Sequence, residues 1–394
     1  FELKDYIDLR FSSEVIDHEQ NKEKVNITVS CPEGKYLLRS CYMVACDGAD
    51  SPTRKRMNLS FEGEIFDEHF LIVDIFMEKP PFESDNPERW FWFAPTFHEG
   101  QSALLHKQAE NIYRIDLQLG ENIDRKSELD PERVRKRIKK VVKSDSFEID
   151  WMSIYKFKCA SLDRMVFDRI IFVGDSAHVV SPFGARGGNG GIHDVDNLGW
   201  KLASIFNDNT SDNILNTYNE ERIEAAKENI ANSSRATNFM TPKNKMAKAF
   251  RDQVLDLSVN NQFFRNIINS GRLSVPFKLS GLRLDNEYRD DPLLGSIYVD
   301  FPILDRKGNQ LFLTDVIANS YNLLSFSKIK IEFPFNINII SVGEENNEDA
   351  DFYDFEGKGL ERYRADLNYF IRPDGYIVGI FKEINISVLE KCML

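Results

Sequence analysis

The sequence lacks the features of a membrane protein and of a nucleic-acid-binding protein. No apolar run approaches the ~20 residues of a membrane-spanning helix, and the opening FELKDYIDLR does not resemble a signal peptide. Basic residues are outnumbered, with 50 Lys and Arg against 63 Asp and Glu, and the net charge is −13. This charge repels phosphate backbones and anionic membrane surfaces. We therefore expect a cytoplasmic protein with no nucleic-acid or membrane partner.

Cysteine is also scarce. The five cysteines are scattered and never spaced as C-x-x-C, so the sequence predicts neither a disulfide framework nor a zinc ribbon. Two glycine-rich phosphate-binding patterns, G-x-x-x-x-G-K-[ST] and G-x-G-x-x-G, are absent. What is present is a chain of 394 residues, 42% hydrophobic and 29% charged, which is long enough for two or three domains.

Local patterns divide the first half of the chain into strands. VNITVS (25–30) and YLLRSCYMVAC (36–46) alternate apolar and polar residues around a turn at Pro32 and Gly34. Aromatic-rich runs from residue 61 onward indicate one antiparallel sheet. A helix is predicted within it at 131–143, with Asp130 as its N-cap.

The second half begins with a change of pattern. The short apolar run in DRIIFVGDSAH predicts a buried parallel strand, and apolar positions from Ile192 to Phe206 follow helical spacing. Residues 213–270 are mostly helical in pattern, with a break at 241. Strand-like runs return from about Tyr298, and Arg372-Pro373-Asp374-Gly375 predicts a hairpin turn.

Residues 174–191, GDSAHVVSPFGARGGNGG, form a glycine-rich junction between a strand and a helix. Glycine is needed where backbone approaches a ligand closely or takes a positive φ. Such a junction directs backbone N–H groups and a helix N-terminus at an anion or a polarised ring. Asp175 suits the hydroxyls of a sugar or ribityl chain, because a carboxylate accepts their hydrogen bonds and repels phosphate.

The junction has three other possible interpretations. A hydrolase nucleophile at Ser176 is disfavoured, because His178 replaces the second glycine of G-x-S-x-G. A metal site from His178, His193, Asp175 and Asp194 has a spacing that fits no familiar ligand pattern. A purely structural glycine turn is the third, although the five glycines from Gly184 to Gly191 exceed what a simple turn requires.

Two segments together resemble a known family. VGDSAHVVSPFGARGGNGGIHDVDNLGWKLA (173–203) resembles the GD motif of the FAD-dependent aromatic hydroxylases, the class A flavoprotein monooxygenases of the para-hydroxybenzoate and phenol hydroxylase type. CDGADSPTRKRM (46–57) resembles the DG motif of the same family. The resemblance continues through residues 218–243 and is closest to 3-(3-hydroxyphenyl)propionate hydroxylase-like proteins.

The resemblance implies an FAD-dependent monooxygenase that uses NADH or NADPH and O₂ to hydroxylate a phenolic or aromatic acid. Asp175 would bind the ribityl chain, and the helix beginning near Gly190 would direct its positive end at the flavin ring. For Arg54, a surface salt bridge is an equally open alternative. The implied cofactor-binding residues are Asp47, Gly48, Arg54, Gly174, Asp175, Pro182, Gly184, Arg186, Gly187, Gly188 and Asn189.

The aromatic-rich sheet is the expected wall of the substrate pocket. Period-two alternation in NIYRIDLQL places Arg114 and Asp116 on one face, with Ile112 and Gln118. Arg114 is a candidate ligand for a substrate carboxylate, but a surface pair of Arg114 with Asp116 is the favoured alternative. His106 and Trp92 are weaker pocket candidates, and core packing is the safer interpretation of Trp92. No general base and no metal ligand can be named.

The resemblance implies a mixed α/β fold. A Rossmann-like FAD-binding domain without its N-terminal βαβ unit would comprise 1–60 and 159–225, followed by a substrate-binding sheet domain (61–158), a helical segment (226–289) and a thioredoxin-like C-terminal domain (290–394). The family's G-x-G-x-x-G is absent, so we expect an N-terminally incomplete fragment of a longer product. The alternative is a catalytically incompetent fragment that keeps the fold as a binding or assembly module. The resemblance also admits a homodimer.

Overall fold

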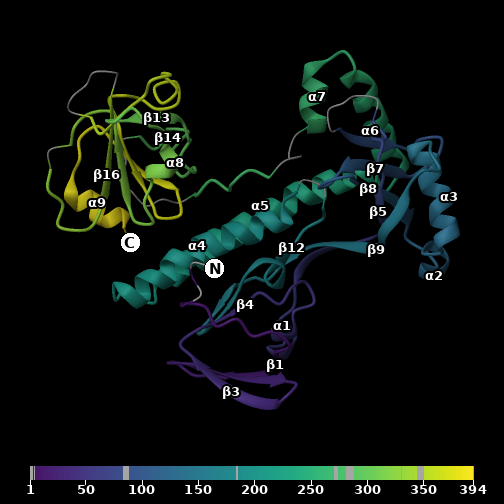
Figure 1. Cartoon of the computed structure of the whole chain (residues 1–394), viewed down its shortest axis with the longest axis horizontal. Coiled ribbons are helices and arrows are strands. Elements are labelled where there is room, and N and C mark those ends of the chain that lie inside the picture. Colours follow the sequence, from purple (N-terminus) through teal and green to yellow (C-terminus); the bar gives the residue numbers. More distant parts are fainter. Residues whose placement is uncertain are drawn as a thin grey trace. The chain divides into compact units, whose positions relative to one another are not determined.

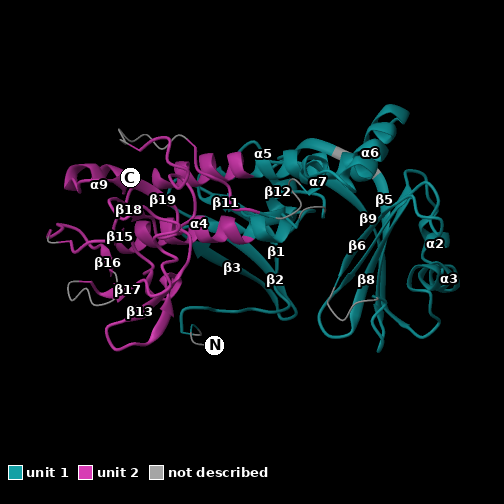
Figure 2. Ribbon diagram, turned by 90° about the horizontal axis from the view of Figure 1, so that it is seen from above, with its two compact units in different colours: residues 1–191, 226–274 teal, residues 192–225, 275–394 magenta. Residues whose placement is uncertain are grey.

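A computed structural model describes residues 3, 5–82, 88–182, 185–269, 274–280, 288–329, 331–343 and 350–393 (Figure 1). The chain forms two compact units. Unit 1 comprises residues 1–191 and 226–274, and unit 2 comprises 192–225 and 275–394 (Figure 2). The mixed helix and strand fold is confirmed, whereas the four predicted domains stay a prediction. Within the described residues, no helix is both long and apolar enough to cross a membrane.

Unit 1 begins with an antiparallel meander of β1 (Glu14–Gln20), β2 (Val25–Cys31) and β3 (Gly34–Ser40). The chain then enters a small sheet in which β4 (Met43–Ala45) pairs in parallel with β11 (Ile170–Phe172), and β11 pairs with β10 (Val166–Phe167). All three residues of β11 are buried, which confirms the predicted buried parallel strand. Because β4 and β11 are parallel, the DG and GD motifs that follow them leave the same edge of the sheet.

The predicted antiparallel sheet is confirmed, with strand order β12-β9-β5-β8-β7-β6. One face is covered by α3 (Pro131–Val142), whose Val134 and Ile138 are buried against the sheet residues Tyr113 and Ile115. Asp130 caps α3 by accepting a hydrogen bond from Arg133 N at 2.9 Å, as predicted. The strands are β5 (Glu62–Phe76), β6 (Arg89–Phe93), β7 (Ser102–Lys107), β8 (Ile112–Gly120), β9 (Glu148–Ser161) and β12 (His178–Val179), and α2 spans Arg125–Glu128.

Two long helices each contribute residues to both units. The helix α4 (Gly187–Asn207) confirms the predicted helix, but its apolar residues Ile192 and Val195 are 67% and 57% exposed. The buried positions of α4 include the polar residues Asn197 and Lys201 instead, because they belong to an ionic network in unit 2. The remaining helices of this region are α1 (Pro52–Arg56), α5 (Ile214–Met240), α6 (Lys245–Ser258) and α7 (Gln262–Asn269), and the predicted break lies between α5 and α6.

Unit 2 contains a mixed sheet with strand order β14-β13-β17-β16-β15-β18-β19. The predicted turn at 372–375 joins β18 to β19, and Gly375 has a φ of 81°. The thioredoxin-like assignment of this region stays a prediction. Its elements are β13 (Pro302–Asp305), β14 (Gln310–Phe312), α8 (Leu313–Val316), β15 (Asn322–Ser325), β16 (Asn338–Gly343), β17 (Phe352–Tyr353), β18 (Asn368–Ile371), β19 (Ile377–Phe381) and α9 (Ile386–Cys392).

Candidate functional site

The DG motif forms a tight turn after β4. Asp47 accepts a hydrogen bond from Thr53 N at 3.0 Å, and Gly48 has a φ of 80°, a conformation that favours glycine. Partial burial raises the pKa of the Asp47 carboxyl, but hydrogen bonds from Ser51 and Thr53 outweigh burial and hold the pKa below its ordinary value. Asp47 is therefore ionised at neutral pH and holds the start of α1 in place.

Arg54 joins the DG motif to the GD motif. Its buried guanidinium donates to Ser176 O at 2.9 Å and to Ala49 O, and it stacks 3.8 Å from the centroid of the Phe61 ring. Arg54 forms no salt bridge with any described residue, so the alternative of a surface salt bridge is wrong. The side chain holds together the two turns from which the family resemblance was inferred.

The GD motif turns sharply after β11. Gly174 begins a 3₁₀ turn (η1, Gly174–Ser176) with a φ of 62°, and the hydroxyl of the fully buried Ser176 donates to Ala45 O at 2.6 Å. Ser176 is thus a structural link between β4 and the turn, and not an exposed nucleophile. Asp175, by contrast, is exposed and accepts no hydrogen bond from the described part of the chain. Its carboxylate is available to a ligand.

The glycines at the junction serve two purposes. A Cβ on Gly191 would lie 3.4 Å from the Cα of Gly174, and one on Gly190 would lie 3.2 Å from Cε1 of His178. These glycines let the first turns of α4 pack closely on η1 and β12. A Cβ on Gly188 would meet nothing within 4 Å, so the backbone there is open. Gly184 lies outside the described residues.

The helix α4 begins at Gly187, slightly earlier than predicted, and Gly190 N donates to Arg186 O at 2.8 Å. The N–H groups of the first helical residues have no partner in the helix, which gives this end a partial positive charge. The buried Arg186 donates from Nη1 to Asn229 Oδ1 at 2.8 Å, and the exposed Asn189 donates to Ala185 O at 2.6 Å. Burial lowers the pKa of Arg186.

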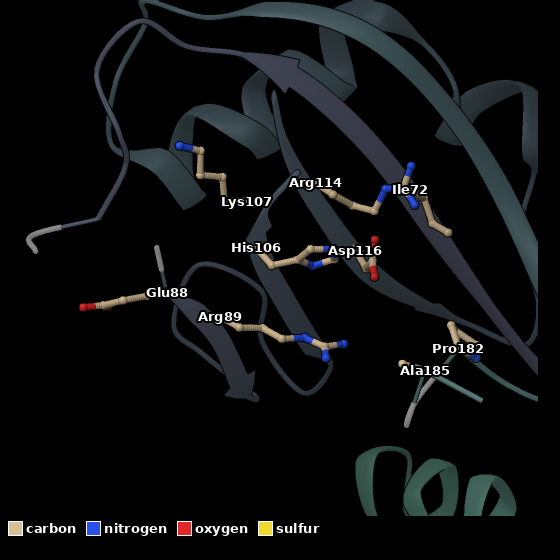
Figure 3. Close-up of a pocket in the computed structure, with 9 residues that line it drawn as sticks. All are labelled: Ile72, Glu88, Arg89, His106, Lys107, Arg114, Asp116, Pro182 and Ala185. Atoms are coloured by element: carbon tan, nitrogen blue, oxygen red, sulfur yellow. The ribbon is translucent and has the colours of Figure 1, made fainter. Parts of the chain in front are cut away.

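A pocket of about 490 Å³ lies between the polar face of the antiparallel sheet and the glycine-rich loop. As the alternation predicts, Tyr113 and Ile115 of β8 are in the core, whereas Arg114 and Asp116 line the pocket. Figure 3 shows the side chains of the sheet on one side and the glycine-rich loop on the other. The lining residues are Ile72, Glu88, Arg89, His106, Lys107, Arg114, Asp116, Pro182 and Ala185.

Arg114 is paired with Asp74 of β5, the residue directly opposite it in the strand register. Its Nε and Nη2 donate to the two carboxylate oxygens at 2.8 and 2.7 Å. The predicted surface pair of Arg114 with Asp116 is therefore wrong. The register decides this, because Asp116 faces Leu104 and Ile72 on the neighbouring strands.

Two polar atoms in the pocket are buried without a partner among the described residues. They are Oδ1 of Asp116 and Nδ1 of His106. Burial raises the pKa of Asp116 to about 7, although Arg114 and Arg89 oppose the shift. Burial, together with the charges of Arg89 and Arg114, lowers the pKa of His106 to about 4, so His106 is neutral at pH 7.

Trp92 lies on the opposite face of the sheet from the pocket. Its ring packs edge-on against Trp90 and Phe97 at 5.5 and 5.2 Å, within the core under α3. Arg89 was not predicted, although the alternation in RWFWF places it on the pocket face with Phe91 and could have indicated it. In the described residues, no group of three His, Cys, Asp or Glu side chains could hold a metal ion.

Comparison with known proteins places this geometry in a family. The family described as "FAD binding domain" matches residues 2–233, more than half of the chain. The 3-(3-hydroxy-phenyl)propionate/3-hydroxycinnamic acid hydroxylase of Escherichia coli (strain K12) is 29% identical over 246 residues, which cover 62% of this chain and 43% of that protein. The chain thus spans less than half the length of this curated relative.

Solved structures show the same fold. The flavin-dependent monooxygenase PieE, in complex with FAD and substrate, superposes with a TM-score of 0.75 at 15% identity over 97% of this chain and 75% of that one. Aklavinone-11 hydroxylase, in a complex with FAD and aklavinone, has a TM-score of 0.73 at 18% identity, covering 98% and 73%. The OxyS anhydrotetracycline hydroxylase from Streptomyces rimosus has a TM-score of 0.69 at 22% identity, covering 94% and 71%. With its two turns at one sheet edge and its matched residues 2–233, the chain belongs to the FAD binding domain family.

Proposed function

We propose that the protein is an FAD-dependent monooxygenase that hydroxylates a phenolic or aromatic acid with NADH or NADPH and O₂. The observation that carries the proposal is the pocket in which the polar sheet face meets Pro182 and Ala185 of the glycine-rich loop. A small-molecule site is expected where apolar walls enclose a few convergent polar groups. The substrates named for the Escherichia coli relative are aromatic acids, which supports the substrate class.

The residues of the two turns fit FAD. Asp175 is exposed and uncommitted, as a ligand of ribityl hydroxyls must be. The open backbone at Gly188 lets a flat ring approach closely, and the positive end of α4 suits a ring edge that gains negative charge on reduction. When bound, the flavin supplies electron transfer and oxygen activation, while the protein binds, orients and shields the substrate.

The pocket also suits an aromatic acid. Ile72 offers an apolar surface for a ring, and Arg89 and Arg114 are both present to balance a carboxylate. Both carboxylate-facing nitrogens of Arg114 are engaged by Asp74, whereas Arg89 forms no ion pair with a described residue. Arg89 is therefore the better candidate for a bidentate contact with the substrate carboxylate. This transfers to Arg89 the role first considered for Arg114.

The test starts from flavin binding. The purified chain and the product of the complete reading frame that encodes it are each mixed with FAD, desalted and examined by visible spectroscopy. Oxidation of NADH and NADPH is then followed with and without 3-(3-hydroxyphenyl)propionate, and the hydroxylated product is sought by mass spectrometry. Retained flavin with substrate-stimulated oxidation supports the monooxygenase. Retained flavin with no oxidation favours the binding or assembly module, and no flavin in either protein contradicts the flavoenzyme.

Two further parts of the proposal concern assembly and location. A homodimer is proposed from the family resemblance, and light scattering coupled to size-exclusion chromatography tests it. A cytoplasmic location, expected from the charge and hydropathy of the sequence, is also proposed, and cell fractionation tests it.

A further inference from the structure

Asp116 has an unusual setting for a carboxyl group. It lies on β8 between β5 and β7, directly opposite the apolar residues Ile72 and Leu104. Its Oδ1 is buried and accepts no hydrogen bond from the described residues, and the nearest guanidinium in sequence, that of Arg114, is held by Asp74. Asp116 as a whole is half-buried, but a buried carboxylate oxygen without a partner costs free energy, so in native proteins such an atom indicates a functional role or a missing partner.

Among the described residues, charged and titratable groups lie near Asp116 on both neighbouring strands. Its diagonal neighbour across the strand pair is His106 of β7, whose Nδ1 is also unpartnered in the described structure. Figure 3 shows the side chains of His106, Arg114 and Asp116 directed into the same pocket. The full set comprises Glu88 before β6, Arg89 of β6, His106 and Lys107 of β7, Arg114 of β8, Asp74 of β5 and Tyr155 of β9.

This setting matches the requirements of a general base. Burial raises the pKa of Asp116 to about 7, so near neutral pH the carboxyl is divided between its two protonation states. A base with a pKa close to the working pH combines availability with proton affinity. The guanidinium of Arg114 lines the same pocket two residues from Asp116, and its positive charge, although shared with Asp74, favours negative charge on a substrate oxygen, while Arg89 keeps its proposed role toward the substrate carboxylate.

We propose that Asp116 is a catalytic base that takes the proton of a ring hydroxyl when a phenolic acid occupies the pocket, an inference that rests on the proposed function. The O–H bond of the ring hydroxyl breaks, and the proton bonds to Oδ1 of Asp116. The electron pair stays on the ring oxygen as an aryl oxide. The step needs no oxidant or reductant. It makes the ring richer in electrons and so prepares it for hydroxylation, and the proton later passes to water beside the exposed Lys107.

The experiment compares Asp116→Asn with wild type and with Asp145→Asn, all as the flavin-loaded protein. Asp145→Asn is a matched control, since it makes the same change at an exposed carboxylate that pairs with Lys139 and does not line the pocket. The probe is 3-(3-hydroxyphenyl)propionate, and its ionisation when bound is read from the near-ultraviolet difference spectrum as a function of pH. Binding of 3-phenylpropionate, which has no hydroxyl, reports whether each variant keeps an intact pocket.

Wild type and Asp145→Asn are expected to ionise the bound phenol far below the ordinary phenol pKa of about 10. Asp116→Asn is expected to bind 3-phenylpropionate normally but to leave the phenol protonated at neutral pH. Its kcat/KM is expected to fall by about 10²-fold or more, the usual contribution of a general base.

Three results would overturn the assignment: ionisation in Asp116→Asn as in wild type, a phenol that stays protonated in wild type, or no binding of the probe to wild type. Failure of the proposed function has a different signature. In that case the probe still ionises on wild type, but no variant oxidises NADH or NADPH in response to it.

Discussion

Replacing Arg372 by alanine is expected to destabilise unit 2 strongly. Arg372, at the turn between β18 and β19, donates to Glu221 of α5 at 2.7 and 2.9 Å and to Asp374 at 2.8 and 2.6 Å. Glu221 also accepts from Lys201 at 3.0 Å and from Asn197 at 2.7 Å. The side chains of Arg372 and Lys201 are 7% and 0% exposed, so this charged cluster is screened from water.

The size of the expected destabilisation follows from the burial of the ion pairs that Arg372 forms with Glu221 and Asp374. Removing one partner of a buried ion pair costs about 3–5 kcal/mol, because the remaining charge is left uncompensated. The pKa of Glu221 gives a second measure. Burial raises it, but Arg372 and then Lys201 lower it from 4.5 to about 2. At about 1.4 kcal/mol for each pH unit, this shift corresponds to about 3 kcal/mol, a net figure for burial and all partners of Glu221 together, of which Arg372 is the largest.

The pKa of Glu221 also predicts how the stability of unit 2 depends on pH. The pKa of Glu221 is lower in the folded state than in the unfolded chain, so its contribution to stability is fully present above the unfolded value of 4.5. The contribution is lost as the pH falls from 4.5 toward about 2. In Arg372→Ala the folded pKa of Glu221 rises because the cation that holds it down is gone, so the loss of stability below pH 4.5 becomes smaller.

Urea unfolding followed by tryptophan fluorescence measures the effect. Trp200 is the one tryptophan within unit 2, and the Arg372 guanidinium lies 5.3 Å from its ring centroid, so the probe reports on the perturbed site. The control is Arg306→Ala, which breaks an exposed pair with Asp351 in the same unit and should cost less than about 1 kcal/mol. The reasoning would be refuted if Arg372→Ala lowered the unfolding free energy no more than Arg306→Ala does.

Three smaller predictions concern unit 1. Asp175→Ala should lower FAD affinity roughly tenfold to a hundredfold, because it removes a hydrogen bond to a charged group. The melting temperature of the flavin-free protein should stay unchanged. An unchanged FAD titration would contradict the assigned role. Gly174→Ala should lower the unfolding free energy by roughly 1–2 kcal/mol, because φ at Gly174 is 62°. Gly188→Ala should not, because a Cβ there would meet open space. Equal effects of the two substitutions would contradict the backbone conformation given for Gly174. Asp130→Ala should lower the unfolding free energy by about 1 kcal/mol, because the N-cap of α3 is lost. Asp145→Ala removes an exposed partner of Lys139 and should lower the unfolding free energy much less. Circular dichroism during thermal unfolding compares the two variants.

Much of the fold was predictable from short-range patterns. The alternation in β8, the cap and spacing of α3 and the turn at 372–375 all depend on residues within a few positions of one another. The place of the two motifs at one sheet edge was predictable too, because each follows a strand and the resemblance supplied their order. Local periodicity reports which face of an element is apolar, and that is the information these predictions used.

The roles of single polar residues were less predictable. Arg54 was considered for a surface salt bridge, yet its guanidinium bonds the carbonyl of Ser176, 122 positions away. The apolar residues of α4 suggested a core face, but Ile192 is exposed and Lys201 is buried in the charged cluster of unit 2. In each case the deciding partner comes from a distant part of the chain.

By itself, the sequence determined the main elements, the two glycine-containing turns and the membership in a flavin-binding family, because these depend on local spacing and on motif residues. Only the tertiary structure decided which polar groups are paired and which are left free. In the register of β8 against β5, Arg114 lies opposite Asp74 and pairs with it. In the registers against β5 and β7, Asp116 lies opposite the apolar residues Ile72 and Leu104. Pairing between strands is set by packing over the whole sheet, so a one-residue change of register would reverse every face. That Oδ1 of Asp116 has no partner among the described residues is thus a property of the fold, and no pattern along the chain reveals it.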